Sequence, residues 1–149
     1  MRQRMGWNFF AAGVFIFIAA SSSFTFASPE YLKENSVRDG VVVLPSGLQY
    51  EIMVEGKGAK PGPRDVVTTH YHGTLTDGSV FDSSVERRAP ASFPLDRVIA
   101  GWTEGLQLMS VGSKWKFFIP SNLAYGDRRI PGIPPNSTLI FEVELLDIE

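Results

Sequence analysis

The feature that most constrains the fold is the division of residues 41–149 into short apolar runs separated by Gly, Pro, Asn and Asp. Apolar runs of this length between turn-forming residues are typical of β-strands. They predict five strands, at residues 41–44, 48–54, 66–75, 115–119 and 139–148. A chain divided in this way favours a sheet built from short, sequential strands over a helical bundle.

The run at residues 139–148 has the clearest strand pattern. Large apolar side chains occupy every second position, at Leu139, Phe141, Val143 and Leu145. Glu142 and Glu144 stand between them. A period of two gives a strand one dry face and one mostly wet face. We therefore expect this strand to be central in the sheet or well covered.

Only residues 98–109 have a helical pattern in the part of the chain that follows residue 40. Apolar residues recur there at helical spacing, at Ile99, Trp102, Leu106 and Met109. Gly101 and Gly105 each lower the helix propensity by about 1 kcal/mol relative to Ala, and small residues beside a Trp favour close packing against a sheet. Five strands and one short helix predict an α+β domain, with a curved antiparallel sheet folded over a single helix.

Residues 1–27 have the three zones of a secretory signal peptide. Two arginines come first, an apolar run of twelve residues follows at 9–20, and a small polar stretch ends at Ala27. A membrane-spanning helix needs roughly 18 apolar residues or more, so we expect no stable membrane span. Cleavage after Ala27 would leave residues 28–149 in the periplasm or outside the cell. Residues 28–39 are polar and too short to form a stable helix alone.

Composition and motifs exclude several classes of protein. The chain has no cysteine, which excludes a disulfide scaffold, a CxxC redox centre, a zinc ribbon and a lipid anchor on cysteine. A net charge of −2 without a block of like charge argues against a nucleic-acid partner. GxSxG and HExxH are absent, and nothing singles out the nucleophile of a Ser-His-Asp hydrolase. His70 and His72 lie on one strand face without a third ligand, so we expect a solvated strand face and neither metal nor cofactor.

Five motifs nevertheless occur in a fixed order. They are YHGTL at residues 71–75, DGSVFDSS at 77–84, VIAGW at 98–102, LAYG at 123–126 and IPPNSTLIF at 133–141. Together they closely resemble the FK506-binding protein family of peptidyl-prolyl cis-trans isomerases. The segment 31–49 is similar, more specifically, to exported bacterial members of the macrophage infectivity potentiator type.

The resemblance implies a half-barrel antiparallel sheet wrapped around one short helix. It covers roughly residues 43–149 and implies three parts: a signal peptide at 1–27, a short N-terminal extension at 28–42 and an isomerase domain at 43–149. Other members of this type dimerise through long N-terminal helices. Only twelve residues, 28–39, precede Gly40 after the expected cleavage, so we expect a monomer.

The resemblance also implies an active site in an apolar cleft between the sheet and the helix. The catalytic positions of the family match Tyr71, Asp82, Trp102, Tyr125 and Phe141. The substrate-binding positions match Phe81, Arg87, Phe93, Val98, Ile99, Ile130 and Ile133.

By the same match, individual residues acquire expected roles. Trp102 would be the floor under the proline ring, and the Ile99 N–H and the Tyr125 hydroxyl would hold the carbonyl oxygens of the ligand. Arg87 would pair with the carboxylate of Asp82. The register of Phe93 and the contacts of the loop at 127–135 stay open, and Arg97 stands where small cytosolic members carry an acidic residue.

The implied activity is faster rotation about X-Pro bonds in exported proteins. It would come from desolvation and positioning in the aromatic cleft, with no covalent step. The implied partners are proline-containing polypeptides and the macrolides FK506 and rapamycin. Two other classes stay open: a peptide-binding chaperone with the same cleft and negligible turnover, and a purely structural extracellular domain.

Overall fold

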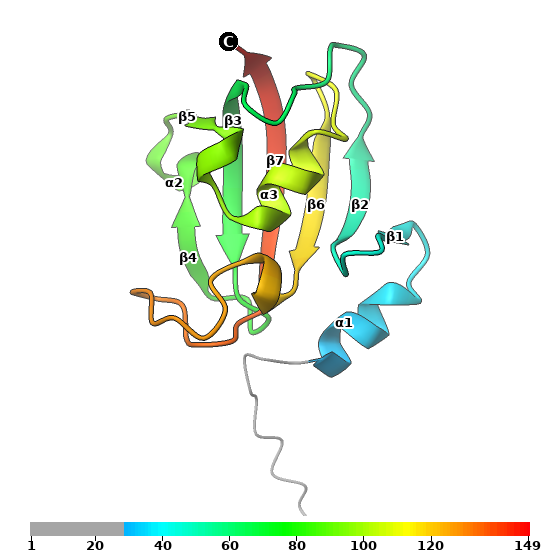
Figure 1. Ribbon diagram of the computed structural model, residues 1–149, viewed down its shortest axis with the longest axis vertical. Helices are drawn as coiled ribbons and strands as arrows, with labels where there is room; N and C mark the ends of the chain where they lie inside the picture. The colour runs from blue at the N-terminus through cyan, green and yellow to red at the C-terminus, as the bar shows by residue number, and fades with distance from the viewer. Residues whose placement is uncertain (1–28) are drawn as a thin grey trace, which may run out of the picture.

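A computed structural model describes residues 29–149, so the expected signal peptide at 1–27 lies outside the described residues. The described strands form one antiparallel sheet in the order β1-β2-β6-β7-β3-β4, with β5 also paired to β3 (Figure 1). The strands are β1 Val41–Val43, β2 Gln49–Val54, β3 Val66–Thr74, β4 Val80–Ser83, β5 Ala91–Pro94, β6 Lys114–Ile119 and β7 Leu139–Ile148. The five expected strands are therefore present, and β4 and β5 are additional.

The helical elements are more numerous than the sequence pattern indicated. They are α1 Pro29–Ser36, α2 Ser84–Arg87, α3 Ala100–Leu106 and the 3-10 turns η1 Leu95–Arg97 and η2 Ser121–Leu123. The helix that the sheet folds over is α3, as expected, and the other helical elements are additional, because short helices can be held by contacts outside their own sequence. In α1, the buried Asn35 donates from Nδ2 to Gln49 Oε1 at 2.8 Å, and Gln49 donates back to the Leu32 carbonyl at 2.9 Å.

β7 is central, as its alternating pattern predicted. It lies between β6 and β3, and Val143 and Leu145 are fully buried. On the opposite face, Glu142 is paired in register with Lys116 of β6, and Glu144 with Lys114. Opposite charges at facing positions of neighbouring strands stabilise a sheet modestly.

α3 lies across one face of the sheet (Figure 1) and packs against it closely. A Cβ added to Gly101 would lie 2.6 Å from Ile119 Cγ2, and one added to Gly105 would lie 2.5 Å from Phe117 Cε1. Real Cβ atoms do not approach so closely, so both glycines allow the helix to approach β6. This confirms the expected close packing, although the helix is shorter than residues 98–109.

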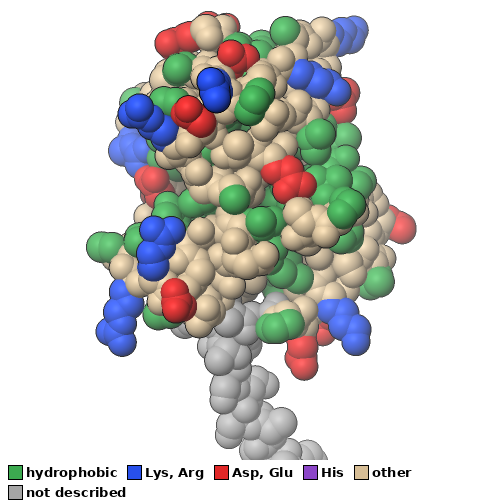
Figure 2. All heavy atoms as spheres, in the orientation of Figure 1, with side chains coloured by type: hydrophobic (Ala, Val, Ile, Leu, Met, Phe, Trp, Pro, Cys, Tyr) green, Lys and Arg blue, Asp and Glu red, His purple; other side chains and the backbone are tan. Residues whose placement is uncertain are grey.

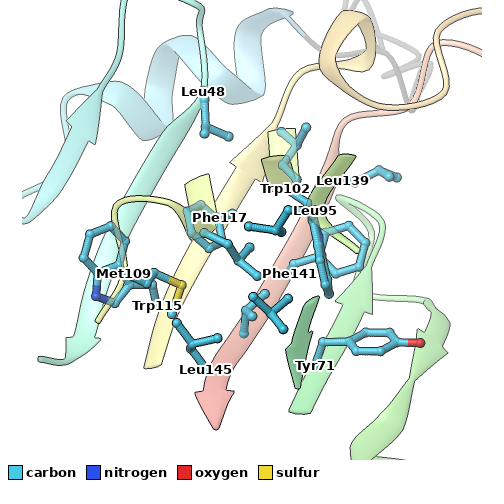
Figure 3. Packing of buried hydrophobic residues seen from close by; sticks show 14 of the residues in the cluster. Leu48, Tyr71, Leu95, Trp102, Met109, Trp115, Phe117, Leu139, Phe141 and Leu145 are labelled. Atoms are coloured by element: carbon cyan, nitrogen blue, oxygen red, sulfur yellow. The ribbon is translucent and has the colours of Figure 1, made fainter. Parts of the chain in front are cut away.

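The hydrophobic core fills the space between α3 and the sheet. Leu95, Leu106, Phe117, Leu139 and Leu145 are fully buried there, and Figure 3 shows this cluster over the same face of β6 and β7. Within residues 29–149, no helix combines the length and the apolar character needed to cross a membrane.

Candidate active site

A cavity of about 570 Å³ opens at the end of α3, beside β3 and the loop between η2 and β7. Eight of the twelve residues expected at the site line it: Tyr71, Asp82, Phe93, Val98, Ile99, Trp102, Tyr125 and Phe141. These residues come from separate parts of the chain, between positions 71 and 141. The fold therefore brings most of the sequence-predicted site together.

Trp102 forms an apolar floor for this cavity. Its side chain points from α3 toward the sheet and is only 4% exposed. Three rings meet it edge-on, with centroid distances of 5.4 Å to Tyr71, 5.6 Å to Phe93 and 5.3 Å to Phe141. Edge-to-face packing is a favoured arrangement of aromatic rings, so the three neighbouring rings help to hold the Trp102 side chain in place. These contacts also place Phe93 in the cavity wall.

Four of the expected residues do not line the cavity. Phe81 packs behind it, edge-on to Phe141 at a centroid distance of 5.3 Å. Ile130 and Ile133 pair with each other in an isolated β-bridge, and Ile133 is buried in the core at 6% exposure. In this structure the two isoleucines hold the loop before β7 in shape, because they bond to each other. Arg87, the fourth residue, acts on the cavity through Asp82.

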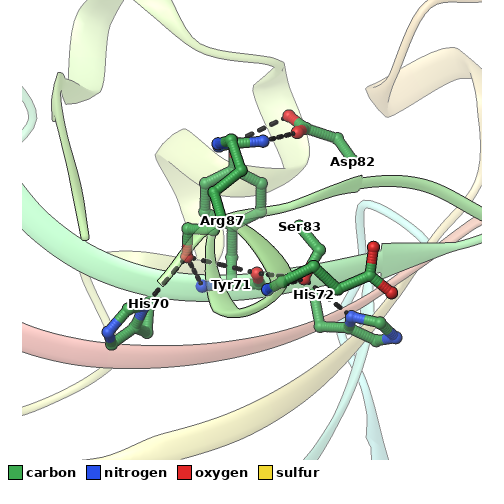
Figure 4. A network of polar contacts seen from close by, with 8 residues as sticks. His70, Tyr71, His72, Asp82, Ser83 and Arg87 are labelled. Carbon is green, nitrogen blue, oxygen red and sulfur yellow. Dashed lines mark hydrogen bonds and ion pairs between the residues drawn. The ribbon is translucent and has the colours of Figure 1, made fainter. Parts of the chain in front are cut away.

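Asp82 is held on the rim by two donors (Figure 4). The Tyr71 hydroxyl donates to Asp82 Oδ2 at 2.6 Å, and Arg87 forms an ion pair with Asp82 Oδ1. Arg87 also donates from its second nitrogen to the Tyr71 hydroxyl at 2.8 Å. One guanidinium group thus fixes both the carboxylate and the phenol.

This arrangement shifts the pKa of both acidic groups. Partial burial opposes ionisation of Asp82, but the hydrogen bonds from Tyr71 and Arg87 outweigh it and hold the pKa of the carboxyl below its usual value. Burial, followed by the bond to the carboxylate, raises the pKa of Tyr71. At neutral pH the rim therefore carries an ionised Asp82 and a neutral Tyr71.

Two serines at the start of α2 place Arg87 next to the cavity. Ser83 caps the helix, because its hydroxyl accepts a 3.1 Å hydrogen bond from the Glu86 N–H. The fully buried Ser84 hydroxyl accepts from the Tyr71 N–H at 2.8 Å and donates to the Tyr71 carbonyl at 3.3 Å. Ser84 thereby ties α2 to the backbone of β3, where β4 has ended.

The two histidines lie on the strand face beside these serines. His70 Nδ1 is 3.0 Å from Ser84 Oγ, and His72 Nδ1 is 2.9 Å from Ser83 Oγ. Both histidines are half-buried, because a serine hydroxyl of α2 or β4 contacts each ring, so this strand face is only partly solvated. Within residues 29–149, no three His, Cys, Asp or Glu side chains gather in a group that could hold a metal ion.

The cavity also contains residues that the motif match did not select as site residues: Arg97, Ala100, Ala124 and Arg128. Ala100 and Ala124 directly adjoin the expected Ile99 and Tyr125, so sequence proximity was a usable signal. Arg97 was noted only for its unusual charge. Arg128 stands in a loop whose path cannot be read from spacing.

Comparison with known proteins gives consistent results. The family model "FKBP-type peptidyl-prolyl cis-trans isomerase" matches residues 57–146, and the model "Domain amino terminal to FKBP-type peptidyl-prolyl isomerase" matches residues 20–52. The FKBP-type peptidyl-prolyl cis-trans isomerase FkpA of Aeromonas hydrophila is 59% identical over 120 residues, covering 80% of this chain and 45% of that protein. The outer membrane protein MIP of Legionella longbeachae is 53% identical over 120 residues, covering 80% and 52% respectively.

Solved structures share the fold. FkpA from Escherichia coli has a TM-score of 0.78 at 50% identity, covering 80% of this chain and 56% of that one. A peptidyl-prolyl cis-trans isomerase from Pseudomonas syringae has a TM-score of 0.75 at 38% identity, covering 80% and 88%. The chain spans about half the length of the curated relatives it matches.

Proposed function

Since this chain belongs to the FKBP-type peptidyl-prolyl cis-trans isomerase family, we propose that its aromatic cavity accelerates rotation about X-Pro bonds in polypeptides. The observation that carries the proposal is the Trp102 floor, walled by three edge-on aromatic rings and bordered by one ionised carboxylate. A buried aromatic surface of this kind suits a proline ring and the peptide bond that precedes it.

The rate enhancement would come from desolvation. Rotation about an X-Pro bond has a barrier of roughly 18–20 kcal/mol, because the resonance of the amide must be broken. The planar amide is more charge-separated than the twisted one, so a dry pocket disfavours the ground state more than the transition state. Removing about 5–7 kcal/mol from the barrier accelerates rotation about 10⁴–10⁵-fold. No bond needs to be made or broken.

The polar groups of the cavity would position the substrate. Ile99 stands just before α3, so its N–H lies outside the helical hydrogen bonds and can reach a substrate carbonyl. The half-buried Tyr125 hydroxyl can hold a second carbonyl from the cavity wall. Asp82 would act as a fixed negative charge: its lowered pKa and its ion pair with Arg87 make it a poor proton acceptor.

We extend the proposal to the ligands, the oligomeric state and the cellular location of the protein. The cavity would bind FK506 and rapamycin on the Trp102 floor, and the protein would act as a monomer. Residues 1–27 would direct export to the periplasm or beyond, residues 28–42 would form a short extension, and residues 43–149 would be the isomerase domain.

Fluorescence tests the macrolide part of the proposal. Rapamycin should change the tryptophan emission of the parent protein, and the Trp102→Leu variant should lose both the change and tight binding. Trp115→Phe is the matched control, because Trp115 lies in the core outside the cavity, stacked on Tyr50 at 4.5 Å. Its response to the drug should persist. If rapamycin did not change the tryptophan emission of the parent protein, macrolide binding would be removed from the proposal.

A protease-coupled isomerisation assay on a Leu-Pro peptide tests the activity itself. We expect acceleration that excess rapamycin abolishes, which would locate turnover in the aromatic cavity. A folded protein that gives no acceleration would overturn the proposal. Suppression of aggregation of a proline-free protein in the same preparation would then favour the peptide-binding chaperone.

A further inference from the structure

Two arginines without ion-pair partners line the cavity. Arg97 ends η1, two residues before Ile99, and Arg128 follows Tyr125 by three residues. Within residues 29–149, the ion pairs are those of Arg38 with Glu51 and of Arg87 with Asp82. Arg128 donates from Nε to the Tyr125 carbonyl at 3.4 Å, a bond that leaves its other nitrogens available. Both side chains are exposed.

The charge of the cavity is opposite to that of the chain. The whole protein has a net charge of −2. The cavity lining holds two guanidinium groups, those of Arg97 and Arg128, and a single carboxylate, that of Asp82, which Arg87 pairs from outside the lining. Asp96 and Asp127 precede two of these arginines in sequence, but neither lines the cavity. Figure 2 shows several Lys and Arg side chains on the left-hand side, interspersed with Asp and Glu.

The two free arginines stand next to the groups proposed to hold the substrate backbone. Arg97 and Arg128 line the same cavity as Ile99 and Tyr125, so a peptide bound through the Ile99 N–H and the Tyr125 hydroxyl would lie beside both arginines. Guanidinium groups bind carboxylates through paired, charge-assisted hydrogen bonds. An acidic side chain close to the proline would therefore find a partner at the rim, whereas a basic one would be repelled.

We infer that Arg97 and Arg128 give the cavity a preference for X-Pro bonds flanked by an acidic residue. This inference rests on the proposed function and names a substrate class for the same site. Both arginines determine specificity at the rim, because the Trp102 floor holds the proline ring whatever its flanking residues. The preferred clients are acidic segments of unfolded polypeptides.

The experiment compares two pairs of peptides by NMR exchange, which measures cis-trans interconversion without a coupling protease. One pair is acetyl-Glu-Leu-Pro-Phe-amide and its Gln counterpart. The other is acetyl-Ala-Leu-Pro-Phe-Glu-amide and its Gln counterpart. An exposed ion pair contributes little binding free energy. We therefore expect kcat/KM at low salt to be about fivefold higher for the Glu peptide than for its Gln counterpart in at least one of the two peptide pairs. Raising the salt from about 0.01 to 1 M shortens the Debye length from about 30 to 3 Å and should bring the ratio close to one.

Variants assign the effect to the two arginines. In Arg97→Gln/Arg128→Gln, the Glu-to-Gln ratio should fall close to one. Arg129→Gln is the matched control: Arg129 is the exposed neighbour of Arg128 and does not line the cavity, so the ratio should persist. A ratio of one in the parent, or a ratio that survives the double substitution, would overturn the inference while leaving the isomerase in place. A parent that accelerates no peptide would instead overturn the proposed function, and the inference with it.

Discussion

The hydroxyl of Tyr71 on β3 donates a 2.6 Å hydrogen bond to Oδ2 of Asp82 on β4, and Arg87 contacts both partners. The bond joins the aromatic wall of the cavity to its charged rim. Because Tyr71 also meets Trp102 edge-on at 5.4 Å, the position of the carboxylate and the position of the floor are coupled through a single ring.

The first prediction concerns the carboxylate. Asp82→Leu should lower kcat/KM on a Leu-Pro peptide about tenfold, because Tyr71 and Arg87 lose a charge-assisted hydrogen-bond partner and the rim loses its negative charge. The fold should survive, since nearly half of the Asp82 side chain is exposed. Isomerisation kinetics and a circular dichroism spectrum measure the two effects.

Asp39→Leu is the matched control for this substitution. Asp39 is exposed and lies two residues before β1, at the opposite edge of the sheet from β4, so its loss should leave kcat/KM unchanged. Equal kcat/KM for folded Asp82→Leu and the parent would remove Asp82 from the mechanism.

The second prediction is a pH dependence of stability. The pKa of Asp82 lies below its ordinary value of 3.8 in the folded protein, so the unfolded chain takes up the proton first as the pH falls. The stabilisation is therefore present above about pH 3.8 and is lost below it. Urea unfolding at several pH values measures this effect. As the pH falls, the free energy of unfolding should decrease more steeply for the parent than for Asp82→Asn.

The comparison with Asp82→Asn is needed because a second group behaves in the same way. Hydrogen bonds from the Ser79 hydroxyl and N–H hold the pKa of Asp77 below its usual value as well. That contribution is common to the parent and the variant and cancels in their difference. If the free energy of unfolding decreased equally at low pH in the two proteins, the stabilising role of the Asp82 hydrogen bonds would be contradicted.

The sequence predicted the strands that form apolar runs between turn-forming residues. β7 has ten residues, and its alternation indicated both the strand and its central place. β4 and β5 have four residues each, and Asp82, Ser83 and Ser92 interrupt them, so they lack the continuous apolar run that indicated the shorter β1. α1 depends on the side-chain pair of Asn35 with Gln49, 14 residues away, which no local pattern contains.

The candidate site was predictable to a similar extent. Trp102, Tyr71 and Phe141 lie on regular elements, so matched motifs place them in the cavity once the fold is known. Arg97 and Arg128 stand outside the regular strands and α-helices, and their position depends on the path of the chain between elements. The Ile130–Ile133 bridge belongs to the same class: the expected cavity contacts of these residues depend on a loop that closes on itself.

The third prediction concerns the approach of α3 to the sheet. Gly105→Ala should destabilise the protein by about 1–3 kcal/mol, because the new methyl group would overlap the Phe117 ring in a packed core. The gain in helix propensity of about 1 kcal/mol offsets only part of this loss. Urea unfolding measures the difference in the free energy of unfolding.

Gly62→Ala is the matched control for Gly105→Ala, because it makes the same substitution in a loop. Its added Cβ would come no closer than 3.4 Å to Asp65 Oδ2, an ordinary contact, so the change in stability should stay within about 0.5 kcal/mol. If Gly105→Ala were as stable as the parent, the close packing of α3 on Phe117 would be contradicted.

The fourth prediction concerns Ser84, which supports the site without lining the cavity. The Ser84 hydroxyl is fully buried and accepts the Tyr71 N–H at 2.8 Å, so Ser84→Ala leaves a buried donor without its partner. The expected loss of stability is about 1–3 kcal/mol. Because Ser84 begins the helix that carries Arg87, kcat/KM should fall as well, with circular dichroism unchanged.

Ser92→Ala on β5 is the matched control. It also removes a serine hydrogen bond, to Thr68, but at an exposed position, so neither stability nor kcat/KM should change appreciably. A Ser84→Ala variant with reduced stability but parental kcat/KM would show that Arg87 keeps its place without this anchor.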